Sequence, residues 1–146
     1  MYKRILVPLE NSRTDAAILA HVAQLARHDD ASLVLIHVAD GFAARNLRQL
    51  DLRESEEMQT DRAYLDATAA RLAGDGLRAE AILASGDPAA EIVSAAERER
   101  CDLIAMGTHG HRWVKDVLLG SVAEAVRHRT LVPVLMVRAR TDDPAS

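Results

Sequence analysis

The sequence predicts an α/β protein built on a single doubly wound sheet, and three observations support this fold class. Apolar segments of strand length alternate with helical segments along the 146 residues. The segment 33–38 is apolar on both alternating faces, which indicates a strand covered on both sides, as in a parallel sheet between helices. Two glycine sites, at 107–110 and 120–121, follow a further apolar segment, where open α/β sheets bind ligands.

Five strands alternating with four helices are expected, and each element has its own signal. Strands are short apolar or alternating segments, and helices carry apolar side chains at three- and four-residue steps. Ser12 with Asp15, and Asp87 before Pro88, are helix-start signals, whereas Gly74 and Gly76 end a helix. The expected segments are strand 3–9, helix 12–27, strand 33–38, variable loop 40–53, helix 54–73, strand 77–84, helix 87–100, strand 102–106, helix 121–128 and strand 132–138.

Two of these strands are expected at the edges of the sheet. The segment 77–84 alternates with the charged residues Arg78 and Glu80, so it is less buried than the others. Pro133 cannot donate to a hydrogen-bond ladder, which places the last strand at an edge of its sheet. Right-handed crossovers join parallel strands. We expect one domain over residues 1–140 and a flexible tail at 141–146.

Composition and charge favour a globular protein of the cytoplasm. Hydrophobic residues make up 49% of the chain, charged residues make up 27%, and the net charge is −4, which provides no basic surface for nucleic acid or an anionic membrane. The apolar runs are too short to span a bilayer, and the amino end begins directly in a strand rather than in a signal peptide. The single cysteine, Cys101, fits a reducing compartment and is expected to be a small packed side chain.

The glycine sites at 107–110 and 120–121 are suited to a polyphosphate ligand. Glycine lets main-chain N–H groups approach a ligand closely, and a helix opening at Ser121 would direct its positive end to the same place. The segment 121–124 also has the pattern of a capping box, so Ser121 as a helix cap is the alternative, and the two roles are compatible. A nucleotide is the favoured ligand, although neither G-x-x-x-x-G-K-[ST] nor G-x-G-x-x-G occurs.

The G-x2-G-x9-G-[ST] spacing, in the context Leu118-Leu119-Gly120-Ser121-Val122, resembles the universal stress protein family in its ATP-binding branch. The resemblance extends over nearly the whole chain, with 5–8 similar to the family's first strand, 33–38 to its second and 132–137 to its last. It implies the strand order 3-2-1-4-5, with two helices on each face of the sheet. Strands one and four would then be neighbours, and a crevice would open between their carboxyl ends.

The same resemblance implies a site for ATP, with magnesium as its partner, and assigns residues to it. The adenine and ribose would lie against Pro8, Leu9, Glu10, Val38, Met106 and Gly107, and the phosphates against His109, Gly110, Arg112, Gly120, Ser121 and Val122. The family usually has aspartate where this chain has Glu10, and often glycine where it has Asn11. Glutamate keeps the charge that accepts hydrogen bonds from ribose hydroxyls, but it adds a methylene.

A nucleotide-binding stress sensor is favoured over an enzyme. Phosphoryl transfer needs a residue that positions the nucleophile and usually a carboxylate-held magnesium, and no recognisable motif supplies them; Asp116 is the only acid between the glycine sites. Slow ATP hydrolysis or autophosphorylation is the enzymatic alternative. A stress protein that works only through protein contacts is the third hypothesis, and the intact glycines argue against it.

The histidines and the last strand give two further expectations. His109 and His111 lack an obvious third ligand, so no metal site is expected there, and His37 is expected to be a hydrogen-bonded core residue. An apolar strand at a sheet edge invites pairing with a second copy. A homodimer through Val132–Val137 is therefore predicted, and the resemblance implies the same interface. No client protein can be named from the sequence.

Overall fold

The computed structural model describes residues 1–40, 47–108 and 117–139. Within these residues, helices and strands alternate along the chain, as the sequence predicts. The elements are β1 (Arg4–Pro8), α1 (Asp15–Asp29), β2 (Ser32–Asp40), α3 (Leu47–Gly74), β3 (Arg78–Gly86), α4 (Pro88–Arg98), β4 (Leu103–Thr108), α5 (Val117–Arg129) and β5 (Val134–Arg138).

The strands form one sheet in the order β3-β2-β1-β4-β5, with every neighbouring pair parallel, which confirms the predicted order. β1 is the central strand: Leu6 is in register with Val34 of β2 on one side and with Ile104 of β4 on the other. The chain therefore builds outward from β1 in both directions. The carboxyl ends of β1 and β4 lie side by side, where the connections leave toward opposite faces.

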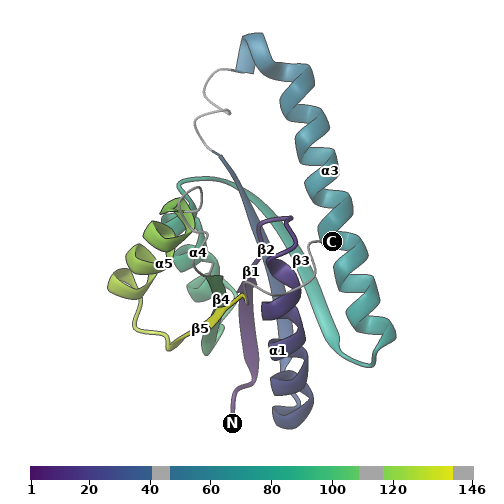
Figure 1. Ribbon diagram of the computed structural model, residues 1–146, viewed down its shortest axis with the longest axis vertical. Helices are drawn as coiled ribbons and strands as arrows, with labels where there is room; N and C mark the ends of the chain where they lie inside the picture. Colours follow the sequence, from purple (N-terminus) through teal and green to yellow (C-terminus); the bar gives the residue numbers. More distant parts are fainter. Residues whose placement is uncertain (41–46, 109–116, 140–146) are drawn as a thin grey trace.

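Two helices cover each face of the sheet, as predicted (Figure 1). Successive side chains of β1 alternate between the two faces, so Ile5 and Val7 pack on α1 and α3, whereas Leu6 packs on α4 and α5. The fully buried apolar side chains of the first face include Ile18, Val22, Leu33, Leu35 and Leu65, and those of the second include Val34, Ile36, Ala95, Ile104 and Val126.

The burial of the strands agrees with their predicted positions. In β2, residues 33–36 are at most 1% exposed, which confirms a strand covered on both faces. β3 and β5 are the two edge strands, also as predicted. Pro133 precedes β5 and contributes only its carbonyl, which accepts a hydrogen bond of 2.9 Å from the Ile104 N–H.

Two helices begin earlier than the sequence analysis predicts. α3 begins at Leu47, so the expectation of a loop throughout 40–53 is wrong for its second half; residues 47–53 contain leucine, arginine and glutamine, which favour helix, and no glycine or proline. α5 begins at Val117, so the helix does not open at Ser121. The capping-box pattern at 121–124 therefore lies inside α5, and the alternative that Ser121 caps the start of the helix is wrong.

Cys101 is buried, and burial raises the pKa of its thiol to about 11, which agrees with a packed side chain. In the parts of the chain that the structure describes, no helix combines the length and apolar character needed to cross a bilayer. The tail expected at 141–146 lies outside the described residues.

Truncation of one buried and one exposed leucine should show that the loss of stability depends on burial and not on residue type. Leu35 is 0% exposed in β2, whereas Leu131 is fully exposed before β5. Leu35→Ala should lower the free energy of unfolding by about 2–5 kcal/mol, because it removes buried methyl groups and leaves a cavity. Leu131→Ala, the matched control, should change it by less than about 0.5 kcal/mol. Urea unfolding measures both, and equal losses would contradict the burial described above.

Candidate functional site

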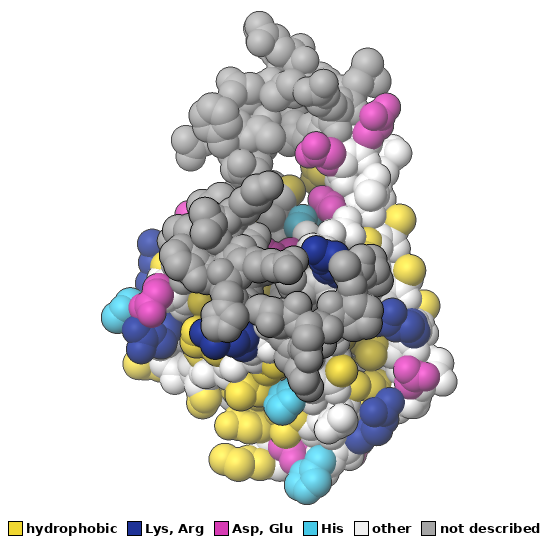
Figure 2. Space-filling model, in the orientation of Figure 1, with side chains coloured by type: hydrophobic (Ala, Val, Ile, Leu, Met, Phe, Trp, Pro, Cys, Tyr) yellow, Lys and Arg dark blue, Asp and Glu magenta, His cyan; other side chains and the backbone are white. Residues whose placement is uncertain are grey.

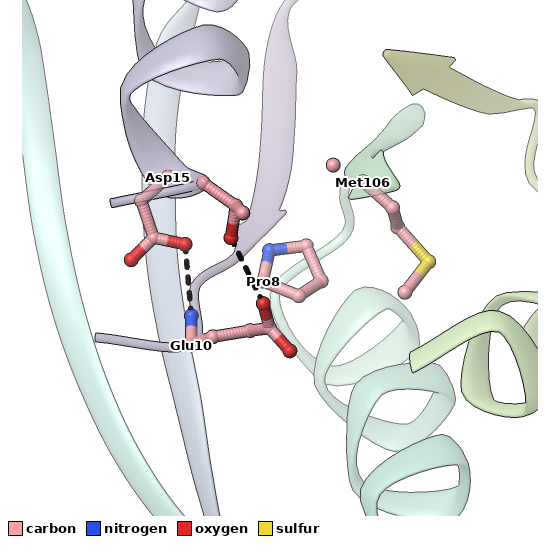
Figure 3. Close-up of a pocket in the computed structure, with 6 residues that line it drawn as sticks. Pro8, Glu10, Asp15 and Met106 are labelled. Atoms are coloured by element: carbon pink, nitrogen blue, oxygen red, sulfur yellow. Dashed lines mark hydrogen bonds between the residues drawn. The ribbon is translucent and has the colours of Figure 1, made fainter. Parts of the chain in front are cut away.

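The carboxyl ends of β1 and β4 enclose a small hollow. It is lined by Pro8 at the end of β1, by Glu10 after it, by Thr14 and Asp15 at the start of α1, and by Met106 and Gly107 on β4. In Figure 3 the side chain of Glu10 extends from its loop toward the side of the hollow where Pro8 and Met106 lie. Residues far apart in the sequence meet here because β1 and β4 are adjacent parallel strands.

Four of the sequence-predicted site residues line this hollow together: Pro8, Glu10, Met106 and Gly107. Leu9 lies next to them, but its side chain is 4% exposed and belongs to the core against α1 and α3. Its N–H donates to the Ile36 carbonyl at 2.8 Å. Leu9 can therefore offer a ligand little of its side chain.

The remaining predicted residues are farther along β2 and α5 or outside the described residues. Val38 lies two positions beyond Ile36, the β2 partner of Pro8, and it packs partly buried against the α4 and α5 side, as Val122 does. Gly120 and Ser121 lie within α5 rather than before it. The predictions for His109, Gly110 and Arg112, and the expectation that His109 and His111 hold no metal, fall outside the described residues.

Gly107 is part of strand β4, in register with Val137 of β5, so this strand continues past the expected end at Met106. A Cβ at Gly107 would lie 3.5 Å from Ile18 of α1, which is ordinary van der Waals contact. Packing therefore does not require glycine at this position. The residue type leaves the wall of the hollow open to a close approach of a ligand.

Asp15 holds the loop between β1 and α1 through hydrogen bonds to the main chain of the loop. Its carboxylate is only 4% exposed and accepts hydrogen bonds from the N–H groups of Glu10 at 3.0 Å, Asn11 at 2.9 Å and Ser12 at 3.3 Å. The Tyr64 hydroxyl of α3 donates a fourth bond at 2.6 Å. Burial, and then the bond to Asp15, raise the pKa of Tyr64, so its hydroxyl remains a donor. A buried carboxylate held by four donors is well compensated for its lost hydration.

The structure accommodates Asn11 where the family resemblance often implies glycine. Its φ of 63° lies in the left-handed region, which asparagine tolerates better than most residues with a side chain. The Asn11 side-chain amide donates to Asp61 of α3 at 3.0 Å. The loop thus keeps the backbone conformation that glycine would allow, and the asparagine adds a bond to α3.

The Glu10 carboxylate contacts two hydroxyl groups of the same loop. Thr14 Oγ1 donates to Glu10 Oε2 at 3.0 Å, and Ser12 Oγ lies 3.5 Å from the same oxygen. The two hydroxyls are themselves 2.6 Å apart. A carboxylate carries a full negative charge near neutral pH and accepts hydrogen bonds, which is the chemistry needed to bind the hydroxyls of a sugar.

His37 is a hydrogen-bonded residue at the edge of the core, as predicted. Its Nδ1 donates to the Leu9 carbonyl at 2.8 Å, since a carbonyl only accepts, and its Nε2 lies 3.2 Å from Asp61 Oδ2. Together with Asn11 and Asp61, it lines a second hollow between the loop and α3. Acidic side chains gather over the adjacent part of α3, where Glu56 and Glu57 also line this hollow (Figure 2).

The described residues hold no cluster of three or more histidine, cysteine, aspartate or glutamate side chains arranged to bind a metal. Glu56 and Glu57 are exposed on α3, so their charges face solvent.

The polar residues that support the loop were not among the predicted site residues: Thr14, Asp15, Asp61 and Tyr64. Asp15 is interpreted above only as a helix-start signal, although its carboxylate binds the preceding loop. Asp61 and Tyr64 occur three residues apart, and Leu65 follows, so they border the apolar face of α3. Their position beside the apolar face of the helix was the signal in the sequence. No neighbouring residue in the sequence indicates which residues they bind.

Comparison with known proteins identifies similar sequences over almost the whole chain. A family model described as "Universal stress protein family" matches residues 1–138. Universal stress protein MJ0577 of Methanocaldococcus jannaschii is 30% identical over 160 aligned positions, which cover 96% of this chain and 97% of that protein. Universal stress protein YxiE of Bacillus subtilis is 29% identical, with coverage of 94% and 100%.

Solved structures share the fold as well. The structure of MJ0577 has a TM-score of 0.85 at 31% identity and covers 97% of this chain and 99% of that one. A universal stress protein in complex with cAMP has a TM-score of 0.70 at 22% identity, with coverage of 95% and 98%. A universal stress protein from Archaeoglobus fulgidus in complex with dAMP has a TM-score of 0.66 at 22% identity, with coverage of 93% and 98%.

Removal of the Tyr64 hydroxyl should test the support of the loop. Tyr64→Phe keeps the ring and deletes the donor to Asp15. Hydrogen bonds to charged groups contribute about 1.5–3 kcal/mol, so the free energy of unfolding should fall by about that amount. Tyr2→Phe is the matched control, because the Tyr2 hydroxyl has no hydrogen bond to any described residue. Equal unfolding midpoints for the two variants would show that the Asp15 bond contributes nothing.

Proposed function

The chain belongs to the universal stress protein family, and from that premise we propose that residues 1–140 form an adenine-nucleotide-binding domain of a stress-response regulator. ATP is the proposed ligand. The base and ribose lie against the residues from β1, β2 and β4, and the phosphates lie against the glycine sites. The proposed residues are Pro8, Leu9, Glu10, Val38, Met106, Gly107, His109, Gly110, Arg112, Gly120, Ser121 and Val122.

The observation that carries this proposal is the convergence of Pro8, Glu10, Met106 and Gly107 on one hollow. Ligands of open α/β sheets bind outside the carboxyl ends of the strands, at the point where the strand order reverses. β1 and β4 meet at that point. The hollow combines the Pro8 ring with the carboxylate of Glu10, which suits a base on one side and a sugar on the other, whereas the Met106 side chain is only 1% exposed and offers a ligand little surface.

The hydrogen bonds of Asp15 support a division of roles around the nucleotide. The N–H groups of Glu10, Asn11 and Ser12 already donate to Asp15, and a second negative group, such as a phosphate, would be repelled there. The phosphates are therefore favoured at the other side of the hollow, toward the glycine sites. α5 begins at Val117, so the positive end of its helix dipole lies four residues before Ser121.

The neighbours with bound ligands support an adenine nucleotide as the ligand class. One is in complex with cAMP and another with dAMP, and both share the fold of this chain. ATP in preference to other adenine nucleotides, magnesium as its partner, and a cytoplasmic location remain predictions from the sequence.

Nucleotide binding rather than turnover is the proposed activity. Slow ATP hydrolysis or autophosphorylation is the enzymatic alternative, and function through protein contacts alone is the other. A multiple-turnover phosphate-release assay separates the first two, since a binding protein should stay well below about 1 s⁻¹, the lower end of typical enzyme rates. The nucleotide-independent alternative requires that ATP does not bind.

A homodimer through Val132–Val137 is the proposed assembly. The two edge strands differ accordingly: β3 carries exposed charges, whereas β5 is mostly apolar. β3 carries Arg78 and Glu80, whose side chains are 62% and 63% exposed, and charged side chains discourage the pairing of edges. β5 carries Val134, Leu135, Met136 and Val137, and Met136 is 45% exposed. Two copies of this apolar edge are self-complementary about a two-fold axis.

Substitution of Glu10 should test its contact with ribose. Glu10→Ala should weaken ATP binding about ten- to a hundredfold, because a charge-assisted hydrogen bond contributes about 1.5–3 kcal/mol. The affinity for 2′,3′-dideoxy-ATP should change much less. Glu97→Ala is the control, since Glu97 is exposed near the end of α4. In titration calorimetry, equal losses for both nucleotides would remove Glu10 from the ribose site, and no binding of ATP to the unaltered protein at millimolar concentration would reject the proposed function.

Substitution of Met136 should test the proposed interface. Met136→Lys places a charge on the exposed edge of β5 and should shift the protein toward monomer in light scattering, because pairing would bury that charge. Met136→Leu keeps the apolar surface and should remain dimeric. An unaltered protein that stays monomeric at high micromolar concentration, or a dimer that survives Met136→Lys unchanged, would rule out this interface.

A further inference from the structure

Thr14 occupies the N-cap position of α1, but its side chain does not cap the helix. It is the residue directly before Asp15, in the position where a threonine hydroxyl usually accepts a hydrogen bond from the first turn. Here its φ of −67° and ψ of −18° are helical, and its side chain makes no capping bond. The hydroxyl instead donates to Glu10 Oε2 at 3.0 Å, so its hydrogen bond goes to the candidate site.

Because glutamate is longer than aspartate, the hydrogen bond from Thr14 affects the orientation of the Glu10 carboxylate. Glutamate has one more rotatable bond than aspartate, so its carboxylate samples more positions around the hollow and loses more rotamer freedom on binding. The Thr14 bond restrains Oε2 and so limits the orientations that the carboxylate can adopt. Figure 3 shows this bond to the Glu10 carboxylate beside Pro8, and Thr14 itself lines the same hollow.

We propose that Thr14 is a positioning residue that directs the Glu10 carboxylate at the ribose and thereby determines the preference of the site for a nucleotide with ribose hydroxyls. This inference rests on the proposed function and deepens it. Ser12 acts with Thr14, since their hydroxyls are 2.6 Å apart and Ser12 also lies 3.5 Å from the carboxylate. Thr14 has this role only because the acid at position 10 is a glutamate that reaches back to the helix start.

The discrimination ratio between ATP and 2′,3′-dideoxy-ATP tests this role. Titration calorimetry gives the ratio for the unaltered protein, for Thr14→Val, which keeps the shape and removes the hydroxyl, and for Thr14→Ser, which keeps the hydroxyl. Thr14→Val should lower the ratio about fivefold, the effect of one net hydrogen bond of about 1 kcal/mol, with the affinity for dideoxy-ATP unchanged. Thr14→Ser should keep the ratio of the unaltered protein. Thr14→Ala replaces Thr14→Val if the latter does not fold.

The outcomes separate this inference from the proposed function. A Thr14→Val protein with an unchanged ratio would overturn the inference, and so would a variant that loses affinity for both nucleotides equally, because a purely structural role predicts that result. Failure of Thr14→Ser to restore the ratio would also overturn it. A ratio of one in the unaltered protein, or a ratio that Glu10→Ala leaves unchanged, would instead remove ribose binding by Glu10 and, with it, the role of Thr14.

Discussion

The central position of β1 is the constraint on which the rest of the molecule depends. β1 pairs with β2 on one side and β4 on the other, so its side chains must alternate between two cores that are both fully buried. Ile5 and Leu6, both 0% exposed, show this alternation. Chain connections then leave β1 and β4 toward opposite faces, and among the described residues Glu10 and Thr14 of the connection after β1 line the hollow between the strand ends.

The loop after β1 is held in place mainly by polar bonds from beneath and from α3. Asp15 gathers consecutive main-chain N–H groups, and Tyr64 and Asp61 attach the loop to the long helix. These bonds bring the carboxylate of Glu10 to the hollow while they consume the local N–H groups. The loop therefore presents negative charge and hydrogen-bond acceptors, which suits hydroxyl groups of a ligand, and it leaves the binding of anionic groups to other parts of the chain.

The fold could be predicted from the sequence because its signals are local and repeated. Apolar segments such as 33–36 indicate buried strands, and the charged positions Arg78 and Glu80 indicate an edge. Helix starts were less predictable, since the capping-box pattern at 121–124 lies within α5 and not at its start. The strand order came from family resemblance and not from the residues themselves.

The candidate site could be predicted only in part, for a different physical reason. Pro8, Met106 and Gly107 lie near the carboxyl ends of apolar strands and Glu10 follows one, so their place at this end of the sheet is evident from the pattern. The supporting bonds are long-range: Tyr64 and Asp15 are 49 residues apart, and other loop contacts reach as far along the chain. No spacing rule within one segment indicates such pairs, because they exist only after β1 and α3 have packed against each other.

Hydrogen–deuterium exchange with and without ATP tests the central claim most directly, because it reports where on the chain a ligand acts. If the nucleotide binds between the ends of β1 and β4, saturating ATP should slow exchange in peptides covering 8–15 and 106–122. Exchange in β3, at Arg78–Gly86, should remain unchanged. Protection confined to other segments, or no protection in either segment at millimolar ATP, would contradict a nucleotide site at this position.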